Sequence, residues 1–344
     1  MALLLSAIVV VGLWTALWFA LATYSKKEIS AWIAAQSQHG NIVSYENVYL
    51  SGYPSRIILN YDKPQLKTAQ PYNIFLNMDA LTISVKPWTP WQATGVMTGK
   101  TTLSASTAYA EYDFSGNIEK IDIFLNPGKF LFDSMNMKIT KPDLAGTITL
   151  HDAGKAKTAS FSADEIILKV NINPEAQAKD VAITMAANTT NMVLPWADAM
   201  PISNHIDSVD LAVSVSGPLA PKLNTSATLG SWRDSGGRVF IDNLTVHGQP
   251  LGVSGGGNMF LDKNLQPAGR MSAKVMGLLP TINRFRDLGL IRDADAVVAK
   301  MTLAAFSQRT SDGKSFLNLG IEIKDSVLYL GPVGIGQLPE IKWQ

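Results

Sequence analysis

The sequence predicts a mainly β protein in which an N-terminal transmembrane helix precedes a long curved antiparallel sheet or two packed sheets, with a few short helices. Three observations predict this fold. The chain begins with a long apolar stretch, most of it from Asn41 onwards alternates apolar and polar residues, and Gly, Pro and Asn separate the alternating runs. No part of the chain alternates strands with long helices, so a parallel doubly wound sheet is not expected.

The composition is apolar and weakly charged. Hydrophobic residues make up 47% of the 344 residues and charged residues 17%, whereas soluble domains carry about 25% charged residues. The net charge of +1 gives no basic patch of the kind that binds nucleic acid. Because there is no cysteine, disulfides, thiolate catalysis and thiolate metal sites are excluded.

The first 25 residues predict a membrane anchor. From Ala2 to Ala22 there is neither charge nor proline, and about 20 such residues are enough for a helix to cross a bilayer. Trp14 and Trp18 lie in the second half, where aromatic rings favour the interface, and Lys26 is the first charged residue. The expected anchor side chains are Leu3, Leu4, Leu5, Ile8, Val9, Val10, Val11, Leu13, Trp14, Leu17, Trp18, Phe19 and Leu21.

Two interpretations of this stretch remain open at the sequence level. Ala20-Leu21-Ala22 resembles the small-x-small pattern that precedes a cleavage site. The apolar run is longer than the roughly 7–15 residues of a signal-peptide core, which favours an uncleaved signal-anchor.

Residues 26–40 predict an amphipathic helix. Ile29, Trp32 and Ile33 repeat at helical spacing, and Gly40 is a suitable C-terminal cap. The helix either lies near the lipid headgroups or covers the first edge of the sheet.

Residues 41–344 predict the β-rich domain, with two sub-domains as an alternative and a boundary near residues 190–205. Its expected strands are 80–85, 120–125, 146–150, 165–171, 181–186, 208–216, 238–246, 258–261, 270–276, 300–305, 316–323 and 326–330. Short helices are expected over 190–200, 278–289 and 292–301, the last two as a helical hairpin over the sheet.

Two strands predict an apolar face. In one, Ile57, Leu59 and Tyr61 point to the same side, and in the other Val209, Leu211, Val213 and Val215 do so. The polar positions of the strands carry mostly Ser, Thr, Asn, Gly and Ala, although exposed sheets normally carry charge. Such a sheet needs cover by a second sheet, by the helical hairpin or by lipid.

Motifs for catalysis and metal binding are weak. Gly252-Val253-Ser254-Gly255-Gly256 matches the nucleophile-elbow pattern, but a strand rather than a helix follows it and the last histidine, His247, precedes the serine. The four histidines have no metal-ligand spacing. We therefore expect no enzyme activity, no cofactor and no metal.

Arg56, which follows Gly52-Tyr53-Pro54, is the polar residue with the most specific candidate role. A guanidinium binds phosphate as a fork, so Arg56 is a candidate for contact with a lipid headgroup. The alternative is that it caps the turn or pairs with a carboxylate such as that of Asp62.

Several segments together resemble a known family. They are the apolar helix, "LSGYPSRIILNYDKP", "SGGGNMFLDKNLQPAGRMSAKVMGL" and "DSVLYLGPVGIGQLP". The chain resembles the domain of unknown function 2125 family of Gram-negative envelope proteins, and is more loosely similar to the AsmA-like proteins, which are anchored β-rich periplasmic proteins associated with lipid handling. The resemblance implies an inner-membrane protein with its bulk in the periplasm.

The function expected from these features is binding or channelling of lipid, or of another apolar envelope component, along the sheet. The alternative is a structural or assembly scaffold that binds another envelope protein through the edge or face of the sheet. The expected partners are therefore the inner membrane, a lipid or an envelope protein, and not nucleic acid.

Overall fold

The computed structural model describes residues 2–38, 40–68, 73–107, 110–127, 132–151, 156–195, 203–218, 226–287, 289, 291–309, 315–341 and 343. Strands dominate these residues, and every strand pairing recorded among them is antiparallel. The mainly β fold class is thus confirmed.

The chain divides into two units. The first comprises Met1–Pro127 and Asn136–Ser162, and the second Gly128–Met135 and Ala163–Gln344. The segment near 190–205, where the sequence suggests a boundary, lies inside the second unit. It connects β11 and β12, which pair with each other.

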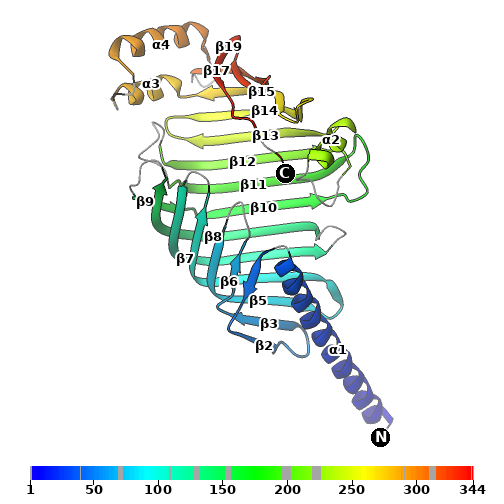
Figure 1. Ribbon diagram of the computed structural model, residues 1–344. Helices are drawn as coiled ribbons and strands as arrows, with labels where there is room; N and C mark the ends of the chain where they lie inside the picture. The colour runs from blue at the N-terminus through cyan, green and yellow to red at the C-terminus, as the bar shows by residue number, and fades with distance from the viewer. Residues whose placement is uncertain are drawn as a thin grey trace. The chain divides into compact units, whose positions relative to one another are not determined.

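The first unit contains one long helix and a set of strands (Figure 1). Strands β2, β3, β5, β6 and β7 pair in that order, β4 also pairs with β5, and β1 pairs with β4. Strand β8, whose residues up to Met135 belong to the second unit, pairs with β9. The elements are α1 (Ala2–Gln38), β1 (Ile42–Ser44), β2 (Asn47–Ser51), β3 (Ile57–Asp62), β4 (Gln65–Lys67), β5 (Phe75–Lys86), β6 (Thr89–Ser106), β7 (Ala110–Pro127), β8 (Phe132–Leu150) and β9 (Ala156–Ser162).

The expected anchor and the expected amphipathic helix form one continuous helix. At a rise of about 1.5 Å per residue, the 37 residues of α1 extend over about 55 Å. Gly40 ends the helix with a φ of 78° and donates its N–H to the carbonyl of Ser37, as the sequence predicts for a glycine cap.

The second unit contains ten pairing strands and three short helices among its described residues. Strands β10 to β15, β17, β18 and β19 pair in that order, and β16 also pairs with β17. The elements are β10 (Glu165–Ile172), β11 (Val181–Val193), β12 (His205–Ser216), α2 (Ser226–Asp234), β13 (Arg238–Gly248), β14 (Gly252–Leu261), β15 (Pro267–Met276), α3 (Leu278–Asp287), α4 (Asp293–Phe306), β16 (Gln308–Arg309), β17 (Ser315–Lys324), β18 (Val327–Leu330) and β19 (Val333–Gln337).

The helices of the second unit lie at the margins of its sheet. Helix α2 lies at one end of the strands, and α3 and α4 lie together beyond β15 (Figure 1). The indole N–H of Trp232 in α2 donates to the carbonyl of Ser216 at 2.8 Å, and the side chains of Ser214 and Ser216 are buried.

The predicted helical hairpin is present as α3 and α4, but it lies beyond β15 rather than over the sheet (Figure 1). Two further local predictions were wrong, and one helix was missed. Residues 300–305 belong to α4 rather than to a strand. Helix α2 was not anticipated. The expected helix over 190–200 begins within β11, which continues to Val193, while residues 196–200 lie outside the described residues.

Candidate functional site

One face of the sheet in the second unit is apolar across seven strands. In an antiparallel pair, residues opposite each other point to the same face, so the strand register defines rows that cross the sheet. Four such rows, from β10 to β17, form what we term the apolar face. They are Ile166, Thr189, Val209, Val246, Val253, Val275 and Leu317; Leu168, Ala187, Leu211, Leu244, Gly255, Ala273 and Leu319; Val170, Met185, Val213, Ile241, Gly257, Met271 and Ile321; and Ile172, Ile183, Val215, Val239, Met259, Gly269 and Ile323.

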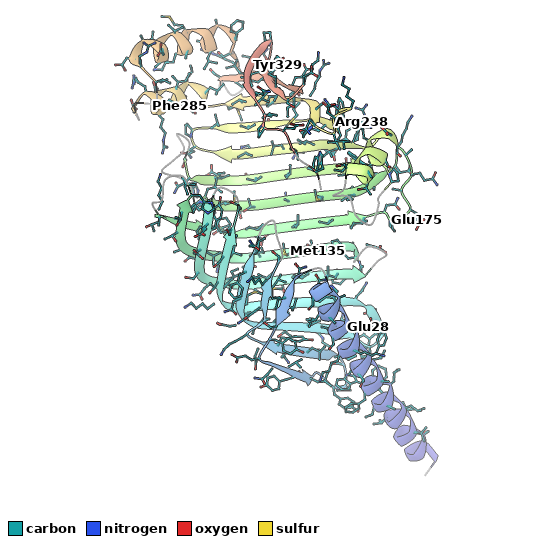
Figure 2. All side chains as sticks on the ribbon, in the orientation of Figure 1. Glu28, Met135, Glu175, Arg238, Phe285 and Tyr329 are labelled. Atoms are coloured by element: carbon teal, nitrogen blue, oxygen red, sulfur yellow. The ribbon has the colours of Figure 1, made fainter. Side chains whose placement is uncertain are left out.

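The opposite, polar face has a different composition. One of its rows reads Ile167, Asn188, Asp210, Thr245, Ser254, Lys274 and Asn318. Its side chains form local pairs, such as the ion pair between Arg270 and Glu322 at 3.0 Å. Arg238, labelled in Figure 2, lies with its guanidinium carbon 5.4 Å from the centre of the Phe260 ring. The two faces therefore present distinct surfaces.

The apolar face remains partly exposed. Val209, Leu211, Val213 and Val215, which the sequence singles out, are all only half-buried, and Met185 is 39% exposed. Side chains in a packed core are normally close to fully buried. These residues are therefore less buried than the side chains of a packed core.

The apolar face is broad, although Val170, Thr189, Ala273, Val275 and Leu317 within it are buried. With strands about 4.8 Å apart and about 3.4 Å per residue, seven strands and the span from Val209 to Val215 cover roughly 30 by 20 Å, or about 600 Å². The largest apolar patch on a typical monomer is about 300–600 Å², and such patches often mark binding sites. The size and composition of the face therefore make it the candidate functional site.

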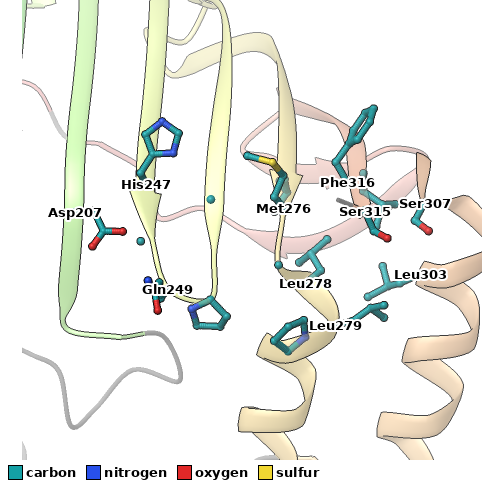
Figure 3. A pocket seen from close by; sticks show the side chains of 17 residues that line it. Asp207, His247, Gln249, Met276, Leu278, Leu279, Leu303, Ser307, Ser315 and Phe316 are labelled. Carbon is teal, nitrogen blue, oxygen red and sulfur yellow. The ribbon is translucent and has the colours of Figure 1, made fainter. Parts of the chain in front are cut away.

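A cavity of about 530 Å³ lies at the ends of β13, β14, β15 and β17, beside α3 and α4. Leu278, Leu279 and Leu303 of the two helices line it (Figure 3). From the sheet, Val275 and Leu317 of the first row contribute to the lining, whereas His247, Met276 and Phe316 belong to a row of the opposite face. The cavity therefore lies at the margin of the sheet, where residues of both faces meet.

The predicted apolar side of β3 lies in a different environment. Ile57, Leu59 and Tyr61 are 1%, 2% and 5% exposed, so they belong to the core of the first unit. Burial raises the pKa of the Tyr61 phenol to about 12, with a smaller contribution from Tyr45, whose ring centre is 4.9 Å away. These residues therefore support the fold rather than the exposed face.

The second half of the apolar helix contacts the Gly-Tyr-Pro turn. The indole N–H of Trp14 donates to the carbonyl of Pro54 at 3.1 Å, and that of Trp18 donates to the carbonyl of Arg56 at 2.9 Å. Trp18 is 3% exposed and its ring packs edge-on against Tyr53 at 5.5 Å. Sequence reasoning assigned these tryptophans to the lipid interface and did not predict this contact.

The other predicted anchor residues differ in their surroundings. Leu21 packs beside Trp18, and the side chains of Leu3, Leu4, Leu5 and Ile8 lie outside the described set. Six of the predicted anchor side chains are exposed on the helix surface: Val9, Val10, Val11, Leu13, Leu17 and Phe19. Among the described helices, α1 is long and apolar enough to cross a membrane.

The candidate catalytic and metal motifs do not assemble into a site among the described residues. Ser254 lies in the middle of β14, paired on both sides by β13 and β15, whereas a nucleophile elbow joins a strand to a helix. Within the described residues, no group of His, Asp and Glu has the geometry to hold a metal ion. Arg56 is exposed, and none of the side chains described forms an ion pair with its guanidinium.

These features define a class of protein: a mainly β chain with an N-terminal helix capable of spanning a membrane and a broad apolar sheet face. The chain belongs to the family described as "Uncharacterized protein conserved in bacteria (DUF2125)", whose model matches residues 18–339. The match begins at Trp18, the residue that joins α1 to the turn.

No curated protein and no solved structure matches the chain. The similarity to AsmA-like proteins therefore remains an expectation from the sequence.

Proposed function

We propose that this protein binds the acyl chains of lipids, or another apolar envelope component, on the apolar face of its second unit, without enzymatic activity. Helix α1 holds the protein in the bacterial inner membrane, and the rest of the chain lies in the periplasm. The supporting observation is the partial exposure of the apolar face, whose four rows contain no charged residue.

The physical basis of this binding is the transfer of methylene groups from water to the apolar face. Each buried methylene contributes about 0.8 kcal/mol, so a chain of ten or more methylenes offsets the cost of immobilising it. The face has roughly 20 Å along its strands, which is the length of such a chain. Since the face carries only apolar groups and Thr189, it recognises the hydrocarbon and discriminates little between headgroups.

The register also suggests where a chain lies. Gly255 and Ala273 pair with each other on the apolar face of β14 and β15, and Gly257 and Gly269 lie in the next two rows, opposite Met271 and Met259. A linear chain along these two strands contacts the backbone at the glycines and the flexible methionine side chains beside them.

A charge placed on the apolar face is expected to abolish lipid binding. The full-length protein is reconstituted in vesicles of phosphatidylethanolamine and phosphatidylglycerol that contain a phospholipid with a photoreactive acyl chain. After illumination, we expect adducts on peptides of β12 to β15 in the wild type. In Val213→Glu these adducts fall at least several-fold, because the carboxylate lies in the middle of the third row.

The matched control is Ala212→Glu, which places the same charge on the adjacent residue and on the polar face. It should leave the adducts unchanged, and circular dichroism checks that both variants fold. Adducts confined to α1, or equal in the two variants, would contradict lipid binding on this face.

The proposed location is tested separately by topology. Alkaline phosphatase fused after Gln344 is expected to be active, since this enzyme folds only in the oxidising periplasm. A fusion of green fluorescent protein at the same position should not fluoresce, because this reporter does not fold when the general secretory route exports it. Fluorescence together with an inactive phosphatase would place the domain in the cytoplasm and overturn the proposed location.

A second candidate function is that of a scaffold for another envelope protein. Helix α4 favours it, because Val297, Met301 and Phe306 are 51%, 70% and 71% exposed. If the photoreactive lipid labels no part of the apolar face and a protein of fixed stoichiometry crosslinks to α4, the scaffold becomes the better account.

A further inference from the structure

The contact between α1 and the Gly52–Arg56 turn fixes the position of the turn along the axis of the helix. Pro54 is bonded at the level of Trp14, and Arg56 is bonded four residues further along, at the level of Trp18. Tyr53 adds a hydroxyl contact of 2.7 Å with Thr15. The turn therefore lies alongside the middle of the apolar stretch and not beyond its end.

The depth of the turn follows from the end of the apolar part of the helix. Exposed apolar side chains continue to Phe19, and Lys26 is the first charged residue of the helix. The boundary of the hydrocarbon core is therefore expected between these two residues. At about 1.5 Å per residue, Trp14 and Trp18 then lie at least about 7 and 1.5 Å below that boundary.

The chemistry of the turn suits this depth. In a bilayer, polar backbone groups must find partners within the protein. The carbonyls of Pro54 and Arg56 accept the two indole N–H groups, and the N–H of Arg56 donates to the carbonyl of Gly52 at 2.9 Å. Pro54 itself has no N–H to satisfy.

The side chains around the turn also fit an interface between lipid and water. Tyr49, Leu50 and Tyr53 are 54%, 44% and 48% exposed, and tyrosine is enriched at headgroup level. Arg56 is exposed and, within the part of the chain that is described, has no carboxylate partner. A long cationic side chain near a membrane boundary extends towards the phosphates.

We infer that the Gly52–Arg56 turn is immersed in the bilayer interface, with Pro54 and Tyr53 below the lipid phosphates and the guanidinium of Arg56 bound to one of them. The inference rests on the proposed anchoring by α1. The β domain is thus seated in the membrane surface, and its first strands begin among the headgroups.

The test uses single cysteines, which the chain permits because it has no native one. Nitroxide labels are placed at Val10, at Ser55 and at Ser115, all of which are exposed. The full-length protein is reconstituted in vesicles of phosphatidylethanolamine and phosphatidylglycerol. Collisions of each label with oxygen, which concentrates in lipid, are compared with those with a water-soluble nickel chelate.

Val10 on α1 is expected to have the highest ratio of oxygen to nickel collisions, Ser115 on β7 the lowest, and Ser55 a value several-fold above that of Ser115. If the collision ratio at Ser55 equals that at Ser115 while the ratio at Val10 shows that it lies in lipid, the proposed immersion of the turn is wrong. The anchoring by α1 is then still supported. If Val10 is also in water, both the anchor and the immersion are wrong.

The contact between Arg56 and a lipid phosphate is tested by a separate measurement. Solid-state NMR of protein labelled at the guanidinium carbon of arginine is expected to show dephasing by lipid phosphorus, and Arg56→Gln should remove that dephasing. Dephasing that is absent, or that persists unchanged in Arg56→Gln, would show that Arg56 does not bind a phosphate.

Discussion

Replacing Trp18 by alanine is expected to release α1 from the first unit. Trp18 is 3% exposed, packs with Ala22 and Ile57, and donates its indole N–H to the carbonyl of Arg56. Removal of a buried tryptophan costs about 3–5 kcal/mol. Since about 1.4 kcal/mol corresponds to a tenfold change in an equilibrium constant, amide hydrogen exchange in β3 should accelerate by about 100-fold or more.

The measurement is hydrogen exchange with mass spectrometry on the peptide that contains β3, with the full-length protein in vesicles. Leu17→Ala is the matched control, because Leu17 is the preceding residue and is 48% exposed, so its loss should leave β3 protected. Trp18→Phe keeps an aromatic ring but loses the hydrogen bond to the carbonyl of Arg56. We expect it to lower the free energy of the contact between α1 and the first unit by only about 1–2 kcal/mol. Equal exchange in all three variants would mean that the helix is not held by this contact.

The strand pattern was well predicted because the sheet of the second unit has one apolar and one polar face. In β12 the alternation of Val209, Leu211, Val213 and Val215 with serine and aspartate survives without modification in the structure. A strand with distinct faces has a strong two-residue period. The same pattern predicted that the apolar residues would share a side, although it could not show whether another layer covers them.

The errors occurred where local patterns are ambiguous. Residues 300–305 form a short apolar run, which by periodicity alone fits a strand or a helix. The acidic residues Asp293 and Asp295 lie in the first turn of α4, where they favour a helix, and the helix simply continues through the run. Helix α2 has two polar serines and Gly230, and it is positioned by the contact of Trp232 with Ser216 rather than by any periodicity.

The length of the strands was also underestimated. β6, β7 and β8 have 18, 18 and 19 residues, whereas the sequence predicts only 120–125 within β7, 146–150 within β8 and no strand within β6. Residues such as Lys141-Pro142-Asp143 are typical of a turn, yet β8 continues through them with Lys141 at a φ of 43°. The pairing of neighbouring strands therefore overrides local turn chemistry here.

The contact between α1 and the turn could not be read from the sequence. An apolar run with tryptophans in its second half has the composition of an interfacial belt. That Trp14 and Trp18 bond to carbonyls 38 to 40 residues away depends on the tertiary fold. As a consequence, two hydrogen bonds and the burial of Trp18 connect the second half of α1 to the β structure of the first unit.

The two candidate surfaces have different physical requirements. The turn needs a fixed depth, which hydrogen bonds and a buried tryptophan supply. The apolar face needs a continuous smooth surface, and this depends on the backbones of β14 and β15 lying close together at the glycines. A substitution that separates these strands tests the second requirement without affecting the first.

Gly257→Val is expected to disrupt the pairing of β14 with β15. A Cβ atom at this position would lie 2.3 Å from the carbonyl oxygen of Arg270 and 2.6 Å from the Cα of Met271, well inside van der Waals contact. Because both atoms belong to the backbone of the neighbouring strand, no side-chain rotation relieves the overlap, and we expect a loss of at least about 3 kcal/mol. Hydrogen exchange in the β15 peptide should then accelerate by about 100-fold or more.

Gly320→Val is the matched control for this substitution. Gly320 lies in β17 of the same sheet, and a Cβ there meets no atom within 4 Å. Valine favours strands more than glycine does, so this variant should be at least as stable as the wild type. If Gly257→Val exchanges no faster than Gly320→Val, β14 and β15 do not approach as closely as the structure shows. The smooth apolar surface proposed for an acyl chain would then lose its structural basis, since its central positions could accommodate side chains.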